Sequence, residues 1–398
     1  MGAAGDVQTA TTVGASGTVV NDGSLTDVSN AGTVTNNGTG NILGTLSNTG
    51  AGGGSSSGTI ATVAHDSTGT FSSSGLITNG VTVTDGTFSN TGTIQGGITN
   101  SAQVAAEGFI DGAMVNQTGG TFTVTGALVA SDTFNNAGTL EVDGGDLTGI
   151  TTLTNTGDVT IADGQTLAAA TINNNTGGSV SVGVGSTLQG TGNTLNNNAT
   201  LDVATNGAVT DAGAINNNAT GVINFNGPGG SATLNAGGAG TGTITNAGEI
   251  NVVSGNVSVG NDDVTTSNLI DVASGSNMSG LATLEQTAGD IQGGGTIDVT
   301  GGFTQSGGTT GGTVDINAAT FAQSGGATIG AGTTVTSSGA QTLLGGTISG
   351  TLDGAGAVTV QTGTTTVDGS ITSGSIDIAS GTLDISGGAA IGDATAVN

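Results

Sequence analysis

The chain has 398 residues, including 80 Gly and one Pro, and it contains no Lys, Arg, Cys, Trp or Tyr. Its 28 acidic residues and single His give a formal net charge of -28. This composition argues against nucleic acid and anionic membrane surfaces as partners, because both are bound mainly through Lys and Arg. It also rules out disulfides and thiolate metal sites, and no apolar run approaches the roughly 18 residues that a membrane-spanning segment needs.

The N-terminal part of the chain carries a repeat that becomes clearer along the sequence. Residues 1–27 show only a weak alternating pattern, so we expect less regular coils there. From Val28 the pattern sharpens, because the segment VSNAGTV, which begins at Val28, is followed by the similar segment LSNTG, which begins at Leu46. Residues 51–58 (AGGGSSSG) are linker-like in composition, and they also match a loop extruded by one coil.

The central part of the chain repeats one unit three times at a fixed interval. The segments FNNAGTLEV, LTNTGDVTI and INNNTGGSVSV begin at Phe134, Leu153 and Ile172, so the two intervals between them are equal. Each unit consists of an apolar residue, an Asn-rich turn, a Gly and a short alternating strand. A unit of this size cannot bury its own apolar face, so it must stack on copies of itself. The repeat therefore predicts a solenoid.

The C-terminal half keeps the repeat but changes its details. Further copies begin at Leu195, Ile215 and Ile244, and the last interval is longer than those before it. Residues 226–242, which include the only proline, are therefore expected to form a loop insertion. In residues 285–398, Gln-Ser-Gly replaces the Asn-rich turn, which predicts variant coils of the same solenoid.

The predicted fold is all-β: a right-handed parallel β-helix (β-solenoid) of about 20 coils with 18 to 23 residues each. We expect residues 1–398 to form a single continuous domain. An antiparallel sandwich is the alternative, but its hairpins do not require so regular a repeat. A leucine-rich repeat has a similar period, yet its Leu-x-x-Leu-x-Leu signature is missing.

The recurring Asn residues have two interpretations. Asn tolerates left-handed backbone conformations and bonds local backbone groups, so it suits a turn in any case. Stacked coil on coil, the same side chains would instead form a hydrogen-bonded ladder. The candidates for such a ladder are Asn30, Asn48, Asn136, Asn155, Asn174, Asn197, Asn217 and Asn246.

The N-x-G-T or N-N-x-G-T turn, followed by alternating apolar residues, resembles the β-helical passenger regions of bacterial autotransporters and related large secreted adhesins. The resemblance covers residues 28–398. It implies an extracellular or cell-surface location and a role in attachment or spacing. The partner it implies is the surface of a host or a neighbouring cell.

The residues needed for catalysis are scarce. A P-loop requires a Lys, and no G-x-G-x-x-G is present. Residues 54–58 (GSSSG) match the nucleophile-elbow pattern, but a chain this rich in Gly produces that pattern by chance. His65, next to Asp66, is the only candidate base, and we expect it to lie in a solvated loop. Polysaccharide lyases of this fold rely on cationic side chains and glycosidases on paired carboxylates beside sugar-stacking aromatic rings, and this chain has no Lys, Arg, Trp or Tyr. We therefore expect no enzyme and no catalytic or cofactor-binding residue.

Calcium is the one metal ion that deserves separate consideration, because carboxylates in Gly-rich turns are hard oxygen ligands. The nonapeptide of calcium-binding β-rolls does not occur, and residues 293–298 (GGGTID) match it only in part. No cofactor is expected, with Ca²⁺ as the alternative. Its candidate ligands are Asp143, Asp146, Asp262, Asp263 and Asp368.

The sequence thus predicts a non-enzymatic, extracellular, structural or adhesive rod of a bacterial surface or secreted protein. The alternative is a self-assembling filament or surface-layer subunit that polymerises through uncapped solenoid ends, because an open strand edge pairs readily with another copy. In the second case the partners are copies of the same chain, joined end to end.

Overall fold

The computed structural model describes residues 6–7, 9–211, 213–238 and 240–392, and it contains strands and turns but no helix in these ranges. Fifty strands, β1–β50, pair in parallel wherever their register is given. The described residues accordingly offer no helix that could cross a bilayer. The all-β parallel solenoid of about 20 coils is confirmed.

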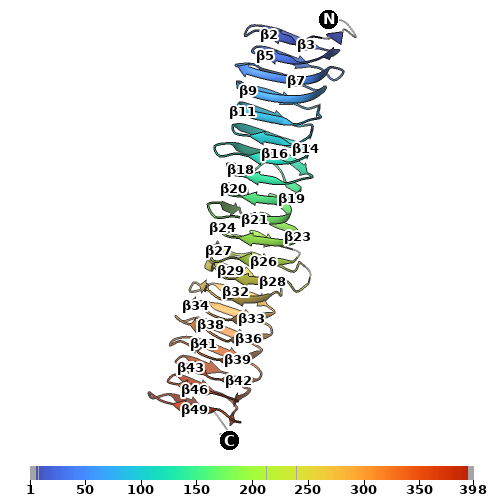
Figure 1. Cartoon of the computed structure of the whole chain (residues 1–398). Helices are drawn as coiled ribbons and strands as arrows, with labels where there is room; N and C mark the ends of the chain where they lie inside the picture. Colours follow the sequence, from blue (N-terminus) through green and yellow to red (C-terminus); the bar gives the residue numbers. More distant parts are fainter. Residues whose placement is uncertain (1–5, 8, 212, 239, 393–398) are drawn as a thin grey trace. The chain divides into compact units, whose positions relative to one another are not determined.

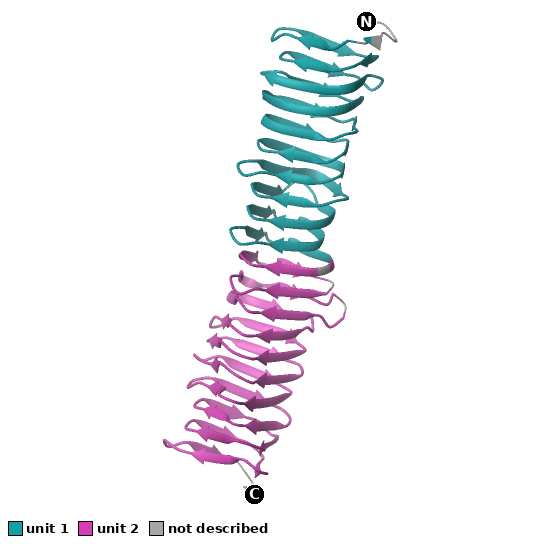
Figure 2. Ribbon diagram, in the orientation of Figure 1, with its two compact units in different colours: residues 1–191 teal, residues 192–398 magenta. Residues whose placement is uncertain are grey.

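The chain divides into two compact units, Met1–Thr191 and Gly192–Asn398 (Figure 2). In each unit the strands lie coil upon coil (Figure 1), and every coil contributes to three stacks of parallel strands. The single continuous domain expected from the sequence stays a prediction.

Unit 1 contains the following strands. Its first stack is formed by β2 (Thr11–Val13), β5 (Val28–Asn30), β7 (Asn41–Gly50), β9 (Thr59–Ser73), β11 (Val81–Asn90), β13 (Ile98–Asn100), β15 (Met114–Asn116), β17 (Phe134–Asn136), β19 (Leu147–Asn155) and β21 (Thr166–Asn174). The second adds β3 (Thr18–Asn21), β6 (Thr33–Asn36), β8 (Gly53–Ser56), β14 (Gln103–Asp111), β16 (Thr121–Ala130), β18 (Thr139–Val142), β20 (Asp158–Ile161) and β22 (Ser179–Val182). The third adds β1 (Asp6–Val7), β4 (Ser24–Leu25), β10 (Leu76–Ile77) and β12 (Thr93–Gln95). Long strands such as β9 and β11 bend and serve two or three stacks.

Unit 2 follows the same plan, and β23 (Thr187–Asn197) enters it through its last residues. Its first stack continues with β26 (Ala214–Asn217), β28 (Thr243–Asn246), β30 (Asp263–Thr266), β33 (Thr283–Gln286), β36 (Gly302–Gln305), β39 (Thr320–Ser324), β42 (Gln341–Leu344), β45 (Ala357–Val360) and β48 (Ser375–Ile378). The second contains β24 (Thr200–Ala204), β27 (Val222–Asn235), β29 (Glu249–Ser258), β31 (Leu269–Val272), β34 (Asp290–Gly293), β37 (Thr309–Thr310), β40 (Thr328–Ile329), β43 (Gly346–Ile348), β46 (Thr364–Val367) and β49 (Thr382–Ile385). The third adds β25 (Ala208–Thr210), β32 (Asn277–Leu281), β35 (Thr296–Val299), β38 (Asp315–Ala318), β41 (Thr334–Ser337), β44 (Thr351–Asp353), β47 (Ser370–Thr372) and β50 (Ala390–Gly392).

The core is formed by the inward side of each strand. In β16, Phe122 and Val124 are buried, whereas Thr121 and Thr123 between them are half-buried. This alternation follows from the pleat, which points successive side chains to opposite faces. Phenylalanine rings meet in the core of both units, with ring centroids 5.2 Å apart for Phe122 and Phe134 and 5.4 Å apart for Phe303 and Phe321.

Two segments differ from what their composition indicates. The Gly- and Ser-rich residues 51–58 include β8, which pairs with β6 and β9, so they belong to a coil and are not a linker. Of the predicted insertion 226–242, the first ten residues lie in β27, where the register shifts between Asn226 and Ser231. The rest connects β27 to β28, and Ala239 lies outside the described residues.

Candidate functional site

The strongest polar feature of unit 1 lies inside it. Seven Asn residues occupy the same inward position on strands of the first stack, and their exposure is 2% or less. Where two of them lie on neighbouring coils, the Nδ2 atom of one donates to the Oδ1 atom of the next, as from Asn136 to Asn155 (2.8 Å) and from Asn155 to Asn174 (3.0 Å), whereas His65 and Val83 occupy the two positions between Asn48 and Asn100. The expected ladder is confirmed, and we call it the Asn column. Its unit 1 members are Asn30, Asn48, Asn100, Asn116, Asn136, Asn155 and Asn174.

Each amide in this column is held by several partners at once. Asn155 accepts at Oδ1 from the Asn136 amide and from the backbone N–H of Gly157 (3.2 Å), and Nδ2 donates to the carbonyl of Ser179 (3.0 Å). A backbone carbonyl only accepts, so the orientation of the amide is fixed. Asn155 therefore has partners for both atoms of its amide, which removes the usual penalty for burying it.

The Gly of the N-x-G turn is required by the close approach of the neighbouring coil. A Cβ atom on Gly157 would lie 2.1 Å from the carbonyl oxygen of Gly138 in the neighbouring coil. A Cβ on Gly138 would in turn lie 2.2 Å from the carbonyl oxygen of Gly120. Coils stacked at a strand spacing of about 4.8 Å leave no room for a side chain at this position. The motif thus pairs an amide that bonds across coils with a glycine that lets the coils approach.

In unit 2 the amide hydrogen bonds reverse their direction part of the way along. Asn197 donates to Asn217 (2.9 Å), Asn217 to Asn246 (2.7 Å), and Asn246 to the hydroxyl of Thr266 (3.1 Å). In the coils that follow, Gln occupies the same position on β33, β36 and β39 and forms the Gln column of Gln286, Gln305 and Gln323. There the amides donate back toward the N-terminus, from Gln323 to Gln305 (3.2 Å) and from Gln305 to Gln286 (3.1 Å), whereas the Nε2 of Gln286 donates to the carbonyls of Gly289 and Thr309 (both 3.0 Å).

His65 is not the solvated loop residue expected from the sequence. It lies in β9 with 1% of its surface exposed, at a position of the Asn column between Asn48 and Val83. The expectation was wrong because the surrounding residues lack the Asn-Gly turn that marks the other coils. Burial lowers the pKa of His65, although a hydrogen bond to Gly69 and the charges of Asp85 and Asp66 act in the opposite direction.

The nucleophile-elbow pattern at residues 54–58 has no catalytic geometry. Ser56 lies in β8 and is 2% exposed, and its hydroxyl accepts a hydrogen bond from the Asn36 amide (3.1 Å). An elbow needs a strand followed by a helix. Among the residues that the structure describes no helix is present, so the pattern here belongs to the core of a coil.

Asp262, one of the candidate calcium ligands, is a carboxylate bound to backbone groups of its own chain. It is fully buried, and its two oxygens accept from the backbone N–H groups of Ala236 (2.5 Å) and Gly242 (2.6 Å). These two residues are the ends of the segment that protrudes between β27 and β28. Asp262 therefore closes this protruding segment, and no signal in the local sequence reveals that contact.

The other calcium candidates do not come together. Asp143, Asp146 and Asp368 are exposed, and Asp146 accepts from the backbone N–H of Thr166. Asp263 accepts from the hydroxyl of Thr283 (2.6 Å). Within the described ranges no three His, Cys or acidic residues are close enough to hold a metal ion.

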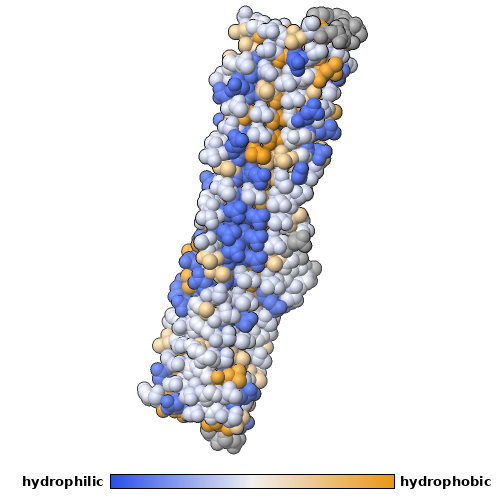
Figure 3. Space-filling model, viewed as in Figure 1, coloured by the Kyte–Doolittle hydropathy of each residue, from blue (hydrophilic) through white to orange (hydrophobic). Residues whose placement is uncertain are grey.

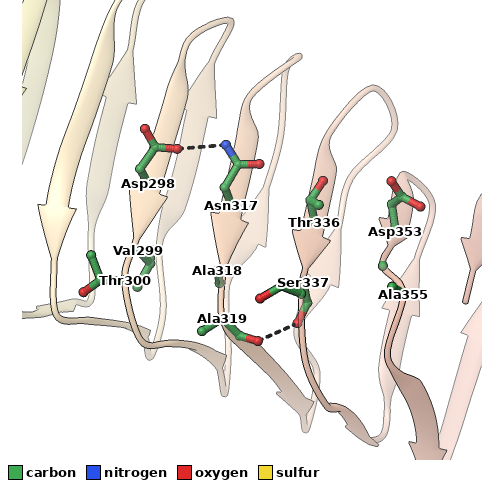
Figure 4. A pocket seen from close by; sticks show the side chains of 12 residues that line it. Asp298, Val299, Thr300, Asn317, Ala318, Ala319, Thr336, Ser337, Asp353 and Ala355 are labelled. Atoms are coloured by element: carbon green, nitrogen blue, oxygen red, sulfur yellow. Dashed lines mark hydrogen bonds between the residues drawn. The ribbon is translucent and has the colours of Figure 1, made fainter.

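A groove with a volume of about 520 Å³ follows the third stack of unit 2 (Figure 4). Asp298, Asn317, Thr336 and Asp353 stand along it on successive strands, in register from β35 to β44. The Asp298 carboxylate accepts from the amides of Asn317 (2.8 Å) and Asn277 (3.1 Å). The groove thus presents polar side chains at the strand spacing, over a floor of small residues that includes Ala318 and Gly354.

Most of the surface is polar but uncharged. On the face drawn in Figure 3, hydrophilic side chains gather in separate clusters, and hydrophobic ones are interspersed, most visibly toward the N-terminal end. Phe109 and Val129, which are register partners on β14 and β16, form one exposed apolar pair. Among the described residues the large apolar side chains with 36% exposure or more are Val20, Leu43, Phe109, Val129, Val184, Val253, Ile378 and Ile385.

Comparisons with known proteins do not assign the chain to a family. No protein-family model matches the chain, and no curated protein matches it.

Proposed function

We propose that the chain is a non-enzymatic, extracellular, structural or adhesive rod of a bacterial surface or secreted protein. The observation that carries this proposal is the register of its strands. In each unit, ten strands of the first stack pair in parallel with inward residues aligned. At about 4.8 Å per strand, nine spacings make each of these stacks about 43 Å long.

Internal bonding favours a mechanical role. Within each unit, the described coils are joined by backbone hydrogen bonds in three stacks and, where an amide column runs, by a buried side-chain bond as well. Deforming a coil therefore breaks several bonds together. Such an element resists bending and stretching, which is the property a spacer needs.

The surface supports a role without chemistry. The two carboxylates in the groove, Asp298 and Asp353, are three strand spacings apart, or about 14 Å. Paired carboxylates of glycosidases are about 5 to 9.5 Å apart. Carboxylates with no Lys or Arg beside them also favour the solubility of an otherwise uncharged surface.

Adhesion by this chain would use the groove between Asp298 and Asp353. Carboxylate, amide and hydroxyl groups at a regular interval offer acceptors and donors to a polar polymer on a cell surface. The matched variants are Asn317→Ala in the groove and Asn135→Ala on an exposed position of β17. Loss of cell binding in the first but not the second supports adhesion through the groove, and equal binding of both contradicts it.

Mechanical stiffness is tested separately by pulling single molecules of the whole chain between its ends. A spacer gives unfolding in steps of one or a few coils at high force. Extension at low force without steps contradicts the proposal.

The second candidate is a filament or surface-layer subunit that polymerises through solenoid ends. The observation favouring it is the C-terminal coil, where Ile378 and Ile385 on β48 and β49 are 36% and 52% exposed. The outer edges of these two strands and of β50 have no strand partner among the described residues. Electron microscopy at rising protein concentration separates the two candidates, since end-to-end fibres support assembly and single particles support the spacer. Ile378→Asp should suppress fibres if this edge joins copies.

A further inference from the structure

We propose that His65 is an acid-sensitive break in the Asn column, so that protonating this one side chain loosens the coils of unit 1 around it. This goes beyond the structural role above, because it adds a condition under which the stack weakens. His65 is the only histidine of the chain.

The donor and acceptor pattern around the ring defines its neutral form. Nε2 lies 3.1 Å from the carbonyl oxygen of Gly69, which only accepts, so Nε2 carries the proton. Nδ1 lies 3.2 Å from Nδ2 of Asn48, whose Oδ1 already accepts from Asn30 (2.8 Å). Nδ1 is therefore the acceptor, and the neutral ring continues the direction of the Asn column.

Protonation changes that acceptor into a donor. The new N–H at Nδ1 would face the N–H of the Asn48 amide, and two donors cannot bond one another. The other register neighbour of His65 is Val83, which offers no polar atom. Turning the Asn48 amide over would satisfy Nδ1 but would place an NH₂ group against the Asn30 amide, so the conflict would only move along the column.

Charged groups near the ring do not remove the conflict. The titratable residues that face it are Asp66, which follows it on β9, and Asp85 on β11, and both are exposed. Their attraction and the bond to Gly69 raise the pKa of His65, but burial outweighs them and the net shift is downward. On β7, the neighbouring strand on the other side, no residue is titratable.

The sign of the pH dependence follows from this shift. With a folded-state pKa below the unfolded value of about 6.5, the unfolded chain binds the proton more readily than the folded chain. The stability contributed by neutral His65 is complete above about pH 6.5 and is lost as the pH falls from there toward the folded-state pKa. The folding equilibrium constant falls by at most about tenfold per pH unit in that window.

The test compares the whole chain with His65→Asn, which restores the residue typical of the column. Urea unfolding of both is measured at intervals from about pH 7.5 to 5, the range in which histidine titrates. We expect the wild type to lose stability below about pH 6.5 relative to the variant, because carboxylates are common to both and cancel. Parallel curves would overturn the proposal.

A second measurement does not depend on the variant. Labelled with ¹⁵N-histidine, the folded chain gives signals from one imidazole only. We expect the Nε2–H tautomer at neutral pH and titration below the ordinary value. The protection of amide hydrogens from exchange, relative to their intrinsic rate at each pH, should then fall in residues 45–85 as the ring titrates. An Nδ1–H tautomer, or titration at about 6.5 without any loss of protection, would overturn the proposal.

Discussion

Gln323 and Leu343 occupy the same inward position on β39 and β42, yet the Oε1 atom of Gln323 has no hydrogen-bond donor there. In the Gln column, the Nε2 atom of one Gln donates to the Oε1 atom of the Gln in the preceding coil. Each Oε1 therefore needs a donor from the coil that follows it. Leu343 cannot supply one. The Gln column therefore ends on a buried acceptor without a partner, which costs roughly 1–3 kcal/mol.

Leu343→Gln should supply the missing donor, because a Gln at this position repeats the geometry of the coil before it. The control is Leu352→Gln, another fully buried leucine whose register neighbours, Val335 and Ile371, are apolar. We expect Leu343→Gln to be more stable than Leu352→Gln by about 1–3 kcal/mol in urea unfolding. Equal losses would show that the unpaired Oε1 of Gln323 has no energetic importance.

Asn136→Asp should destabilise unit 1 strongly, because the new oxygen replaces a donor that serves Asn155 Oδ1 (2.8 Å) and the carbonyl of Asp158 (3.0 Å). An unpaired buried charge costs about 3–5 kcal/mol. The matched control is Asn135→Asp, an exposed neighbour on the same strand, which should stay within about 0.5 kcal/mol of the wild type.

This penalty should depend on pH. Burial among acceptors raises the pKa of an Asp at position 136 above its unfolded value, so the loss is complete at neutral pH and shrinks as the pH falls through the raised pKa. Thermal unfolding at several pH values measures this. A penalty that grows on acidification contradicts the assigned orientation of the amide.

Asp262→Asn should release the segment that protrudes between β27 and β28. The carboxylate accepts two backbone N–H groups, and an Asn would turn an NH₂ group toward one of them. We expect a loss of about 2 kcal/mol and faster amide exchange at Ala236 and Gly242. Asp263→Asn is the control, because an Asn there still accepts from Thr283. Unchanged exchange in Asp262→Asn would show that the segment closes by other contacts.

Gly157→Ala should cost about 1–3 kcal/mol, because its Cβ meets the carbonyl oxygen of Gly138 at 2.1 Å and the stacked coil cannot yield. Gly326→Ala has open space around its Cβ and a backbone that other residues adopt, so it should be neutral or slightly stabilising. Differential scanning calorimetry of both variants checks the contrast. Similar melting temperatures would mean that the coils separate easily.

The coil can be predicted from the sequence because the residues that recur at the coil length are those whose side chains point inward. Apolar residues and Asn30, Asn48 or Asn155 recur at the coil length, and both the stack and the amide bonds follow from that interval. His65 shows where the motif fails as a guide. His65 lies one coil length after Asn48 and one before Val83, so counting coil lengths would place it in the Asn column. The residues next to it do not reveal this, because they lack the Asn-Gly turn motif.

Other features depend on contacts that spacing does not encode. Asp262 lies one coil length after Gly242, but it also accepts from Ala236 across the segment that interrupts the repeat, and this second bond does not follow from the spacing. The hydrogen bonds of the Gln column run in the opposite direction to those of the Asn column because of the side-chain torsions. These torsions cannot be predicted from the presence of Gln in place of Asn. The groove at Asp298 arises from small residues on several coils together.

The opposite directions of the two amide columns restrict how such a chain can be rebuilt by copying its own coils. A duplicated Asn coil placed beside Asn155 would extend that column head to tail, and a duplicated Gln coil beside Gln305 would do the same. Grafting one kind directly onto the other would bring two NH₂ groups face to face. Thr266, whose hydroxyl accepts from Asn246 and donates to the carbonyl of Asn268, lies between the two columns and ends the first of them without a second amide. Any gain or loss of coils across that junction must keep a residue of this kind between the two polarities.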